Sequence, residues 1–189
     1  ESVFMLHRER YVEQNRALNG ANFVESVTDE DARRIADEFL TMGAKIVLIK
    51  MGAKGLYLRT AEPGRLENMG RAMPQIDEWA LRELWQAPLY VERIVSATGA
   101  GDVAIAGFLA SFLAGKGPEE ALQAANITAS LCLQSSDSSG KLLPLEAMMQ
   151  CVGKEDQPVE YLPLPKDTWS AASLNGLFVG KRDGRPSAS

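Results

Sequence analysis

The sequence predicts an α/β fold with a mostly parallel sheet, and three observations support this. An amphipathic helix over 29–42 is followed by a glycine and a short apolar strand, an order typical of parallel sheets. A glycine-rich segment at 99–102 follows an expected strand and opens a helix of small residues. The chain of 189 residues suits one domain, which can bury roughly 70% of its unfolded surface.

The first part of the chain predicts two helices. Residues 3–19 have loosely helical apolar spacing and end at a glycine. The helix over 29–42 is better defined, because Thr28 is a good N-cap and Asp31 stands three residues later. Gly43 supplies the stop signal.

Two strands follow the second helix. Residues 45–50 are apolar and β-branched, which indicates a buried strand, and residues 56–59 form a second strand after a glycine-containing turn at 51–55. Residues 61–77 contain two prolines and two glycines, which predicts a surface excursion.

The remaining elements alternate between helix and strand. We expect a short helix over 78–86, an alternating strand over 90–95, and helices over 101–114, 118–133 and 144–151. Glycines separate the first two of these long helices, and a proline opens the second at a favourable position.

The composition of the chain changes after residue 152, where prolines become frequent and the end is rich in Ser, Gly and Arg. Residues 1–152 are expected to form one folded unit, and 153–189 an extended, proline-containing tail with about ten disordered residues at its end. Trp169 and Phe178 suggest that the tail docks on the domain or on a neighbouring molecule, for which a homodimer is one candidate.

Composition argues against several classes of function. Lys plus Arg is 20 and Asp plus Glu is 25, so the net charge of -5 disfavours nucleic-acid partners. No apolar run approaches the ~20 residues that span a bilayer, and no signal peptide is evident, so we expect no membrane partner and a cytoplasmic location. The single histidine and the pair Cys132 and Cys151 have no metal-site spacing, and the thiols suit a reducing compartment. The chain starts at Glu1 rather than Met, so we expect a preceding segment.

The segment 96–102 carries the clearest candidate chemistry. Gly99, Ala100 and Gly101 let a ligand approach the backbone, and free N–H groups at a helix N-terminus attract anions. Asp102 beside them is a poor phosphate ligand but a sensible general base for a hydroxyl that attacks a bound phosphoryl group. A plain glycine turn with a helix-favouring acid is the alternative.

Two further segments are weaker candidates. Gly52 and Gly55 could let a nucleotide lie across the backbone, and Lys54 could contact a phosphate; a simple hairpin turn is the alternative. Asn126 lies in a helix of small residues and could bind an adenine or ribose edge; ordinary helix packing is the alternative.

Taken together, the three segments resemble the ribokinase-like (PfkB-type) carbohydrate kinases. The stretches VLIKMGAKGLYLR, ATGAGDVAIAGFLAS and AANITASLCL occur in the family's order, and the resemblance covers about residues 1–150. It implies a three-layer α/β/α sandwich, of which residues 1–152 represent the C-terminal, nucleotide-binding half. Family members are longer, and the segment that selects the acceptor precedes the part seen here.

The resemblance also implies roles for individual residues. Asp102 matches the family's catalytic base, and 99–101 match the anion hole for the transferring phosphoryl group. Gly52 and Gly55 match the turn beside the ATP site, where Lys54 also lies, and Asn126 lies near the adenine pocket.

The implied co-substrate is ATP with Mg²⁺ on its phosphates. Glu1 takes the place of the acid in the family's Asn-x-x-Glu element, which orders the water shell of that metal. Ser96 and Ala97 replace the usual Asp and Thr, so a monovalent-cation requirement is not expected, and Lys50 replaces a residue that is often Thr.

The expected function is therefore ATP-dependent phosphorylation of a hydroxyl on a sugar or related small molecule. Two alternatives stay open: a non-catalytic nucleotide-binding or regulatory module of the same fold, and a kinase for a nucleoside or vitamin.

Overall fold

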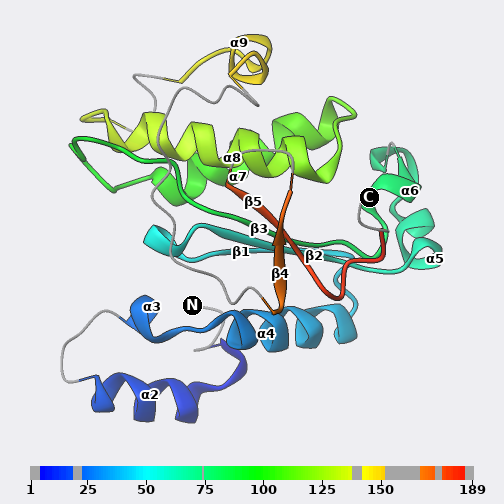
Figure 1. The fold of residues 1–189 in the computed structure, drawn as a ribbon, viewed down its shortest axis with the longest axis horizontal. Coiled ribbons are helices and arrows are strands. Elements are labelled where there is room, and N and C mark those ends of the chain that lie inside the picture. The colour runs from blue at the N-terminus through cyan, green and yellow to red at the C-terminus, as the bar shows by residue number, and fades with distance from the viewer. Residues whose placement is uncertain are drawn as a thin grey trace.

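A computed structural model describes residues 5–18, 23–73, 75–137, 142–151, 167–172 and 176–185. It contains one five-stranded sheet with helices on both faces, as Figure 1 shows. Helix α4 (Asp29–Thr41) covers one face, while α7 (Ala100–Leu113) and α8 (Pro118–Leu133) cover the other. The expected α/β layering is thus present in the part that the structure describes.

The sheet is antiparallel throughout its described strands, so the prediction of a mostly parallel sheet is wrong for them. The reason is local: β1 and β2 are joined by residues 51–55, far too few for the crossover that parallel neighbours require. In spatial order the strands are β1 (Ile46–Lys50), β2 (Leu56–Thr60), β3 (Glu83–Gln86), β5 (Leu177–Gly180) and β4 (Trp169–Ala171).

The predicted helix over 78–86 is only partly present. Helix α6 (Ile76–Trp79) ends early, and Leu81 has a left-handed φ of 55°, which breaks the helical path. The chain then forms β3, in which Trp85 lies opposite Tyr57 of β2. The excursion between β2 and β3 also contains α5 (Pro63–Leu66) and the 3₁₀ helix η2 (Glu67–Ala72).

The helix predicted over 29–42 is confirmed as α4. The Thr28 hydroxyl accepts from the Asp31 N–H at 3.1 Å, and the Asp31 carboxylate accepts from the Thr28 N–H at 3.1 Å, so the capping box is complete. The helix predicted over 3–19 is present as the shorter α2 (Arg8–Ala17). Between α2 and α4 lies α3 (Phe23–Ser26), a single helical turn.

The two long helices predicted from glycine and proline signals are also confirmed, and they cross closely. A Cβ at Gly107 of α7 would overlap the Thr128 hydroxyl and lie 2.9 Å from the Ala124 carbonyl oxygen of α8. The glycine therefore permits the contact between the helices. The short helix α9 (Leu145–Met149) lies over α8, as Figure 1 shows.

No strand forms over 90–95, contrary to the prediction. Ile94 and Val95 are 61% and 50% exposed, and no neighbouring strand pairs with them. Instead, the N–H groups of Val95 and Ser96 donate to the Leu133 carbonyl oxygen at the end of α8, at 2.8 and 3.3 Å. The alternating pattern is thus carried by a loop that spans from β3 to α7.

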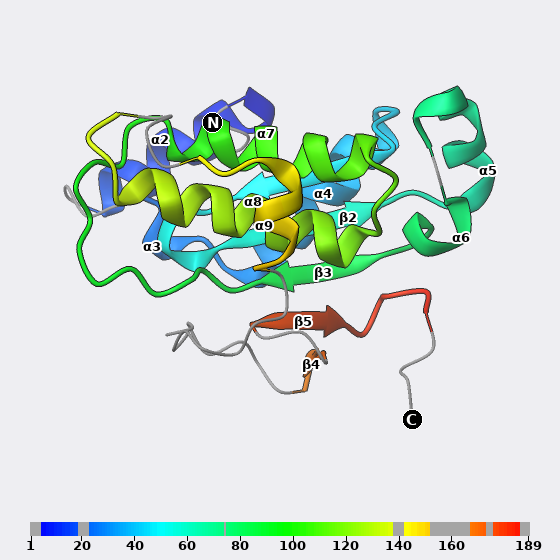
Figure 2. The same ribbon diagram turned by 90° about the horizontal axis from the view of Figure 1, so that it is seen from above.

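The described part of the tail is built into the sheet. Strand β5 pairs with β3 and β4 pairs with β5, beyond the edge of the helical layer in Figure 2. Trp169 is only 4% exposed and contacts the rings of Trp85 and Tyr57, with centroids 5.7 and 6.1 Å apart. Residues 180–185, expected to be disordered, are held by hydrogen bonds to β3, whereas 186–189 lie outside the described residues.

The main core lies between the sheet and the α7–α8 layer. The Trp79 ring packs edge-on against Phe108 and Phe112, with centroids 5.8 and 5.0 Å away. This packing fixes α7, and with it the turn at its N-terminus, against the sheet. Among the described helices, none is long and apolar enough to cross a membrane.

Candidate functional site

The glycine turn at 99–101 has the backbone form that an anion site needs. Gly99 has a φ of 83°, a left-handed value that glycine adopts readily, and α7 begins at the next residue. Asp102 N–H donates back to the Gly99 carbonyl at 3.0 Å, and Ser96 Oγ accepts from Thr98 N–H at 3.2 Å. Within the part of the chain that the structure describes, the N–H groups of Gly99 and Gly101 make no hydrogen bond. They are therefore available to a ligand at the positive end of a 14-residue helix.

Asp102 lies beside these donors in the first turn of α7. Its side chain is exposed, and no ion pair or side-chain hydrogen bond engages its carboxylate among the described residues. A free carboxylate next to a set of anion-binding N–H groups can accept a proton from a hydroxyl held there.

Lys50, at the end of β1, brings a positive charge to the same turn. Its ammonium donates to the Gly101 carbonyl oxygen at 3.0 Å and lies 2.9 Å from the position that a Cβ at Gly101 would take. The sequence marks Lys50 only as an unusual residue before a glycine turn. Its contact with Gly101, 51 residues away, depends on the tertiary structure.

Lys54, the lysine within the 51–55 turn, points away from the turn at 99–101. The Lys54 ammonium donates to the carbonyl oxygens of Glu25 and Val27, at 2.6 Å each, and thereby ties the turn to the α3–α4 connection. Its predicted contact with a phosphate gains no support from this position and stays a prediction.

The two glycines of this turn differ in what they need. Gly55 has a φ of 89°, and a Cβ there would overlap the Gln86 carbonyl oxygen of β3. Close approach of β3 thus explains why this position is a glycine, and its predicted place beside a nucleotide stays a prediction. Gly52 has a φ of 53° and open space around its Cβ position, so it keeps the room that a ligand would use.

Asn126 is buried and already bonded. Its Nδ2 donates to the Ala87 carbonyl at 2.7 Å, and its Oδ1 accepts from the Leu89 N–H at 3.4 Å. The side chain thus anchors the loop that leaves β3, and its predicted contact with an adenine or ribose edge stays untested.

The described residues form no metal centre. No group of three or more His, Cys, Asp or Glu side chains comes together among them, and Glu1, the predicted acid near Mg²⁺, lies outside the described residues. The Ala100 N–H donates to the Ala97 carbonyl oxygen at 3.4 Å, so in the described chain the free donors of the turn are the N–H groups of Gly99 and Gly101. Together with the Lys50 ammonium they suit phosphate oxygens rather than a cation.

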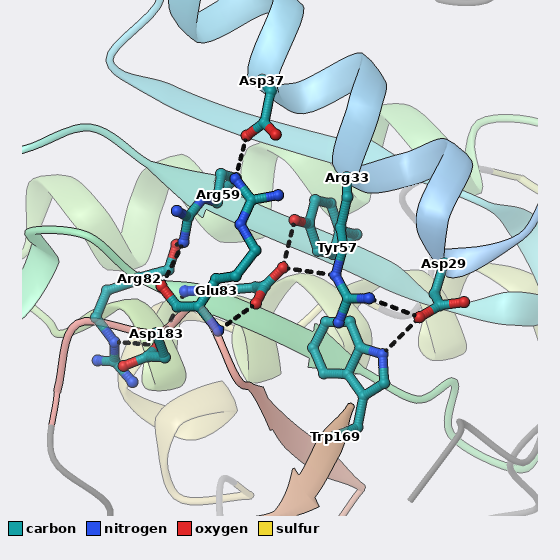
Figure 3. A network of polar contacts seen from close by, with 10 residues as sticks. Asp29, Arg33, Asp37, Tyr57, Arg59, Arg82, Glu83, Trp169 and Asp183 are labelled. Carbon is teal, nitrogen blue, oxygen red and sulfur yellow. Dashed lines mark hydrogen bonds and ion pairs between the residues drawn. The ribbon is translucent and has the colours of Figure 1, made fainter. Parts of the chain in front are cut away.

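A second polar cluster, which the sequence did not predict, lies on the α4 side of the sheet (Figure 3). Glu83 of β3 is fully buried, and its carboxylate accepts from Arg33 Nε at 2.8 Å, the Tyr57 hydroxyl at 3.1 Å and the Arg182 N–H at 2.9 Å. Burial raises the pKa of the Tyr57 phenol far above its ordinary value, and the charge of Glu83 raises it further. The phenol therefore remains a neutral hydrogen-bond donor.

The same cluster extends into the tail. Arg82, which is 1% exposed, pairs with Asp183 at 2.9 Å and with Glu119 at 2.8 Å, and Asp183 also accepts from the Glu83 N–H at 2.8 Å. The cluster therefore joins α4, the sheet and the tail through paired charges. Arg59 is the exception in Figure 3, since among the described residues its guanidinium donates only to the carbonyl oxygens of Arg82 and Arg182.

A hollow of about 670 Å³ runs along α4. Its lining includes Arg33, Asp37, Glu38 and Arg182, and Asp37 is paired with Arg182 at 2.7 Å while Glu38 is bonded to His7 at 2.7 Å. Its lining includes no residue of the turn at 99–102, and the helix that lines it, α4, lies across the sheet from α7 (Figure 1).

Comparisons with known proteins identify the family of the chain. A family model described as pfkB family carbohydrate kinase matches residues 15–144. An uncharacterized sugar kinase of Archaeoglobus fulgidus is 30% identical over 111 residues, which is 59% of this chain and 36% of that protein. Ribokinase of Arabidopsis thaliana is 32% identical over 95 residues, 49% of this chain and 20% of that protein. The matched segments thus span about a third or less of these relatives' lengths.

Solved structures show the same fold. The structure of Arabidopsis thaliana ribokinase complexed with ribose and ATP aligns with a TM-score of 0.50 at 26% identity, over 65% of this chain and 34% of that chain. A putative sugar kinase from Clostridium perfringens aligns with a TM-score of 0.50 at 18% identity, over 66% of this chain and 33% of that one. With the family model matching more than half of its residues, the chain belongs to the pfkB family of carbohydrate kinases.

Proposed function

We propose that the protein transfers the γ-phosphoryl group of ATP to a hydroxyl group of a sugar or a related small molecule. The observation that carries this proposal is the exposed, unpaired carboxylate of Asp102 directly after Gly101, whose N–H group has no partner in the described chain. A general base and an anion site are the two groups that phosphoryl transfer to a hydroxyl needs side by side. Membership in the family supports the same reaction.

The reaction follows from these groups. Asp102 accepts the proton of the acceptor hydroxyl, and the oxygen forms a bond to the γ-phosphorus. The bond between that phosphorus and the β–γ bridging oxygen breaks, so the products are ADP and a phosphate monoester. The N–H groups of Gly99 and Gly101 and the α7 dipole stabilise the negative charge on the transferring group.

Mg²⁺ is expected on the ATP phosphates, where it neutralises part of their charge when bound. In this proposal the N–H groups of Gly99 and Gly101 and the ammonium of Lys50, which lies beside the turn, bind the phosphates, and Asp102 is left to the acceptor. Because Ser96 and Ala97 bring no charge to the turn, we propose that no monovalent cation is required.

The test compares two exposed aspartates, each in the first turn of a helix. Asp102→Asn removes the proposed base, whereas Asp77→Asn changes an exposed acid in the first turn of α6, far from the site. The complete protein encoded by the gene is incubated with Mg-ATP and a panel of sugars and nucleosides, and ADP release and phosphorylated product are measured. Nucleotide affinity is measured separately by calorimetry.

We expect Asp102→Asn to keep nucleotide affinity and to lower kcat by about 10²–10⁴-fold, while Asp77→Asn behaves as the wild type. An unchanged kcat in Asp102→Asn contradicts the assignment of the base. ATP binding by the wild type without transfer to any acceptor would favour the non-catalytic nucleotide-binding module, which the uncharged Ser96 and Ala97 make the second candidate.

A further inference from the structure

We propose that Cys132 is a positioning residue, whose thiol orients the peptide unit that carries the Gly99 N–H group so that this group faces the phosphate; the proposal rests on the proposed function. Cys132 lies in the last turn of α8 and is only 2% exposed. Its thiol donates to the Thr98 carbonyl oxygen at 3.6 Å, although the two residues are 34 positions apart. The reaction described above leaves this buried thiol without a part.

The peptide unit between Thr98 and Gly99 connects this contact to the site. A peptide unit is planar, and no cis peptide bond occurs in the described chain, so the Thr98 carbonyl and the Gly99 N–H point in opposite directions. Because the carbonyl is bonded to the thiol of α8, the Gly99 N–H is directed away from Cys132, and it makes no hydrogen bond to the described residues. A rotation of this peptide unit by half a turn would reverse both groups and remove one free donor from the turn.

The end of α8 also holds the backbone just before this peptide unit. The Leu133 carbonyl oxygen accepts from the N–H groups of Val95 and Ser96, at 2.8 and 3.3 Å. These bonds fix the approach to the turn, but they leave the orientation of the 98–99 peptide open, since glycine permits several backbone conformations. Among the described residues, the Cys132 thiol is the donor that the Thr98 carbonyl has. The thiol is therefore the contact that decides which way the peptide faces.

The thiol is also covered by the turn that it holds. Thr98 is exposed, whereas Cys132, in contact with the Thr98 carbonyl, is buried. A reagent in solution reaches the thiol when the turn moves away from α8, which is a local opening of the structure. A phosphate bound to the Gly99 N–H holds the turn in place, so the reactivity of the thiol reports whether the turn is occupied.

The first measurement is the rate at which iodoacetamide alkylates each thiol in the complete wild-type protein, followed by mass spectrometry of the peptides that contain Cys132 and Cys151. Cys151 is the internal control, because it is exposed and its thiol donates to the Ala147 carbonyl oxygen of α9 at 3.4 Å. A ligand at about ten times its Kd lowers the population of a form that it cannot bind by about tenfold. We therefore expect ATP and ADP to slow the alkylation of Cys132 about tenfold, adenosine to leave it unchanged, and Cys151 to react equally fast throughout.

The second measurement uses variants of the two cysteines. Cys132→Val removes the donor while keeping the bulk of the side chain, Cys132→Ser keeps a donor, and Cys151→Val makes the matched change at the exposed thiol. We expect Cys132→Val to lower kcat by about 3- to 10-fold, because one hydrogen bond biases an equilibrium by that factor. Cys132→Ser should retain most of the wild-type kcat, and Cys151→Val all of it. Thermal unfolding checks the fold of each variant, and the alkylation measurement does not depend on any of them.

The outcomes separate this proposal from the proposed function. A wild type that binds ATP and phosphorylates an acceptor, while Cys132 is alkylated equally fast with and without ATP, overturns the role of Cys132 and leaves the function standing. Equal protection by adenosine and ADP also overturns it, because the thiol would then become accessible only through wider unfolding. A folded Cys132→Val variant with unchanged kcat overturns it as well.

Two outcomes concern the proposed function itself. Protection of Cys132 by ATP, without transfer to any acceptor, supports the link between the thiol and the turn and overturns the phosphoryl transfer. A wild type that binds no ATP overturns both proposals.

Discussion

Replacing Glu83 with glutamine should weaken the whole fold, although the residue lies far from the glycine turn. Glu83 is fully buried, and its carboxylate is shared by Arg33 of α4, Tyr57 of β2 and the backbone of Arg182 in the tail. Glutamine has nearly the same size, so the change removes the negative charge and one acceptor rather than volume.

The magnitude follows from the partners that remain. Removing one partner of a buried ion pair costs about 3–5 kcal/mol, because the other charge stays buried without compensation. Arg33 is 12% exposed and keeps Asp29 at 3.1 Å, so we expect the lower end, about 3 kcal/mol, for Glu83→Gln. For a chain of this size that corresponds to a fall in Tm of about 6–12 °C.

Urea denaturation followed by tryptophan fluorescence measures the free energy of unfolding, since Trp85 and Trp169 lie beside the cluster. Glu13→Gln, an exposed glutamate of α2, is the control and should change stability by less than about 0.5 kcal/mol. A Glu83→Gln variant within about 1 kcal/mol of the wild type would refute the reasoning, since that is no more than an ordinary hydrogen bond contributes.

Three further expectations can be checked with the same protein. Gly107→Val should cost about 1–3 kcal/mol in urea denaturation, because its side chain overlaps the Thr128 hydroxyl, whereas Ala106→Val on the exposed face of α7 should cost far less. Tyr57 keeps its proton in the folded state because its pKa is raised, so absorbance at 295 nm should show one of the four tyrosines failing to ionise until the protein unfolds. Unfolded Tyr57 releases its proton near its ordinary pKa of about 10, so the free energy of unfolding should fall as the pH rises above that value. Tyr57→Phe should make that fall less steep, and an unchanged slope in the variant argues against a contribution from Tyr57. Exchange of K⁺ for Na⁺ should change turnover less than about twofold, because the turn before α7 has no carboxylate to hold a monovalent cation; strict K⁺ dependence would contradict this.

The helices that the sequence predicted well are those with local signals. The Thr28 cap, the glycine at 43 and the apolar face of 29–41 lie within one helix, and the structure has α4 there with its capping box complete. Glycine and proline likewise bound α7 and α8. The left-handed Gly99 and the placement of Asp102 in the first helical turn follow from the same local pattern.

The strands were harder to predict than the helices, because a strand needs a neighbouring strand that its own sequence does not identify. The pattern over 90–95 alternates as a strand does, yet no neighbour pairs with it, whereas β4 and β5 form from a tail that reads as irregular. Strand direction is also decided by the path of the connection, which made the sheet antiparallel.

By itself the sequence determined the family, the helical layers and the glycine turn with its aspartate, because each of these depends on residues close together in the chain. Only the tertiary structure decided which charged side chains reach that turn. Lys50 and Lys54 stand four residues apart on one hairpin, yet the first ammonium meets Gly101 and the second meets the carbonyls before α4. The partner of a long, flexible side chain depends on what the fold packs beside it, and for Lys50 that neighbour lies 51 residues away.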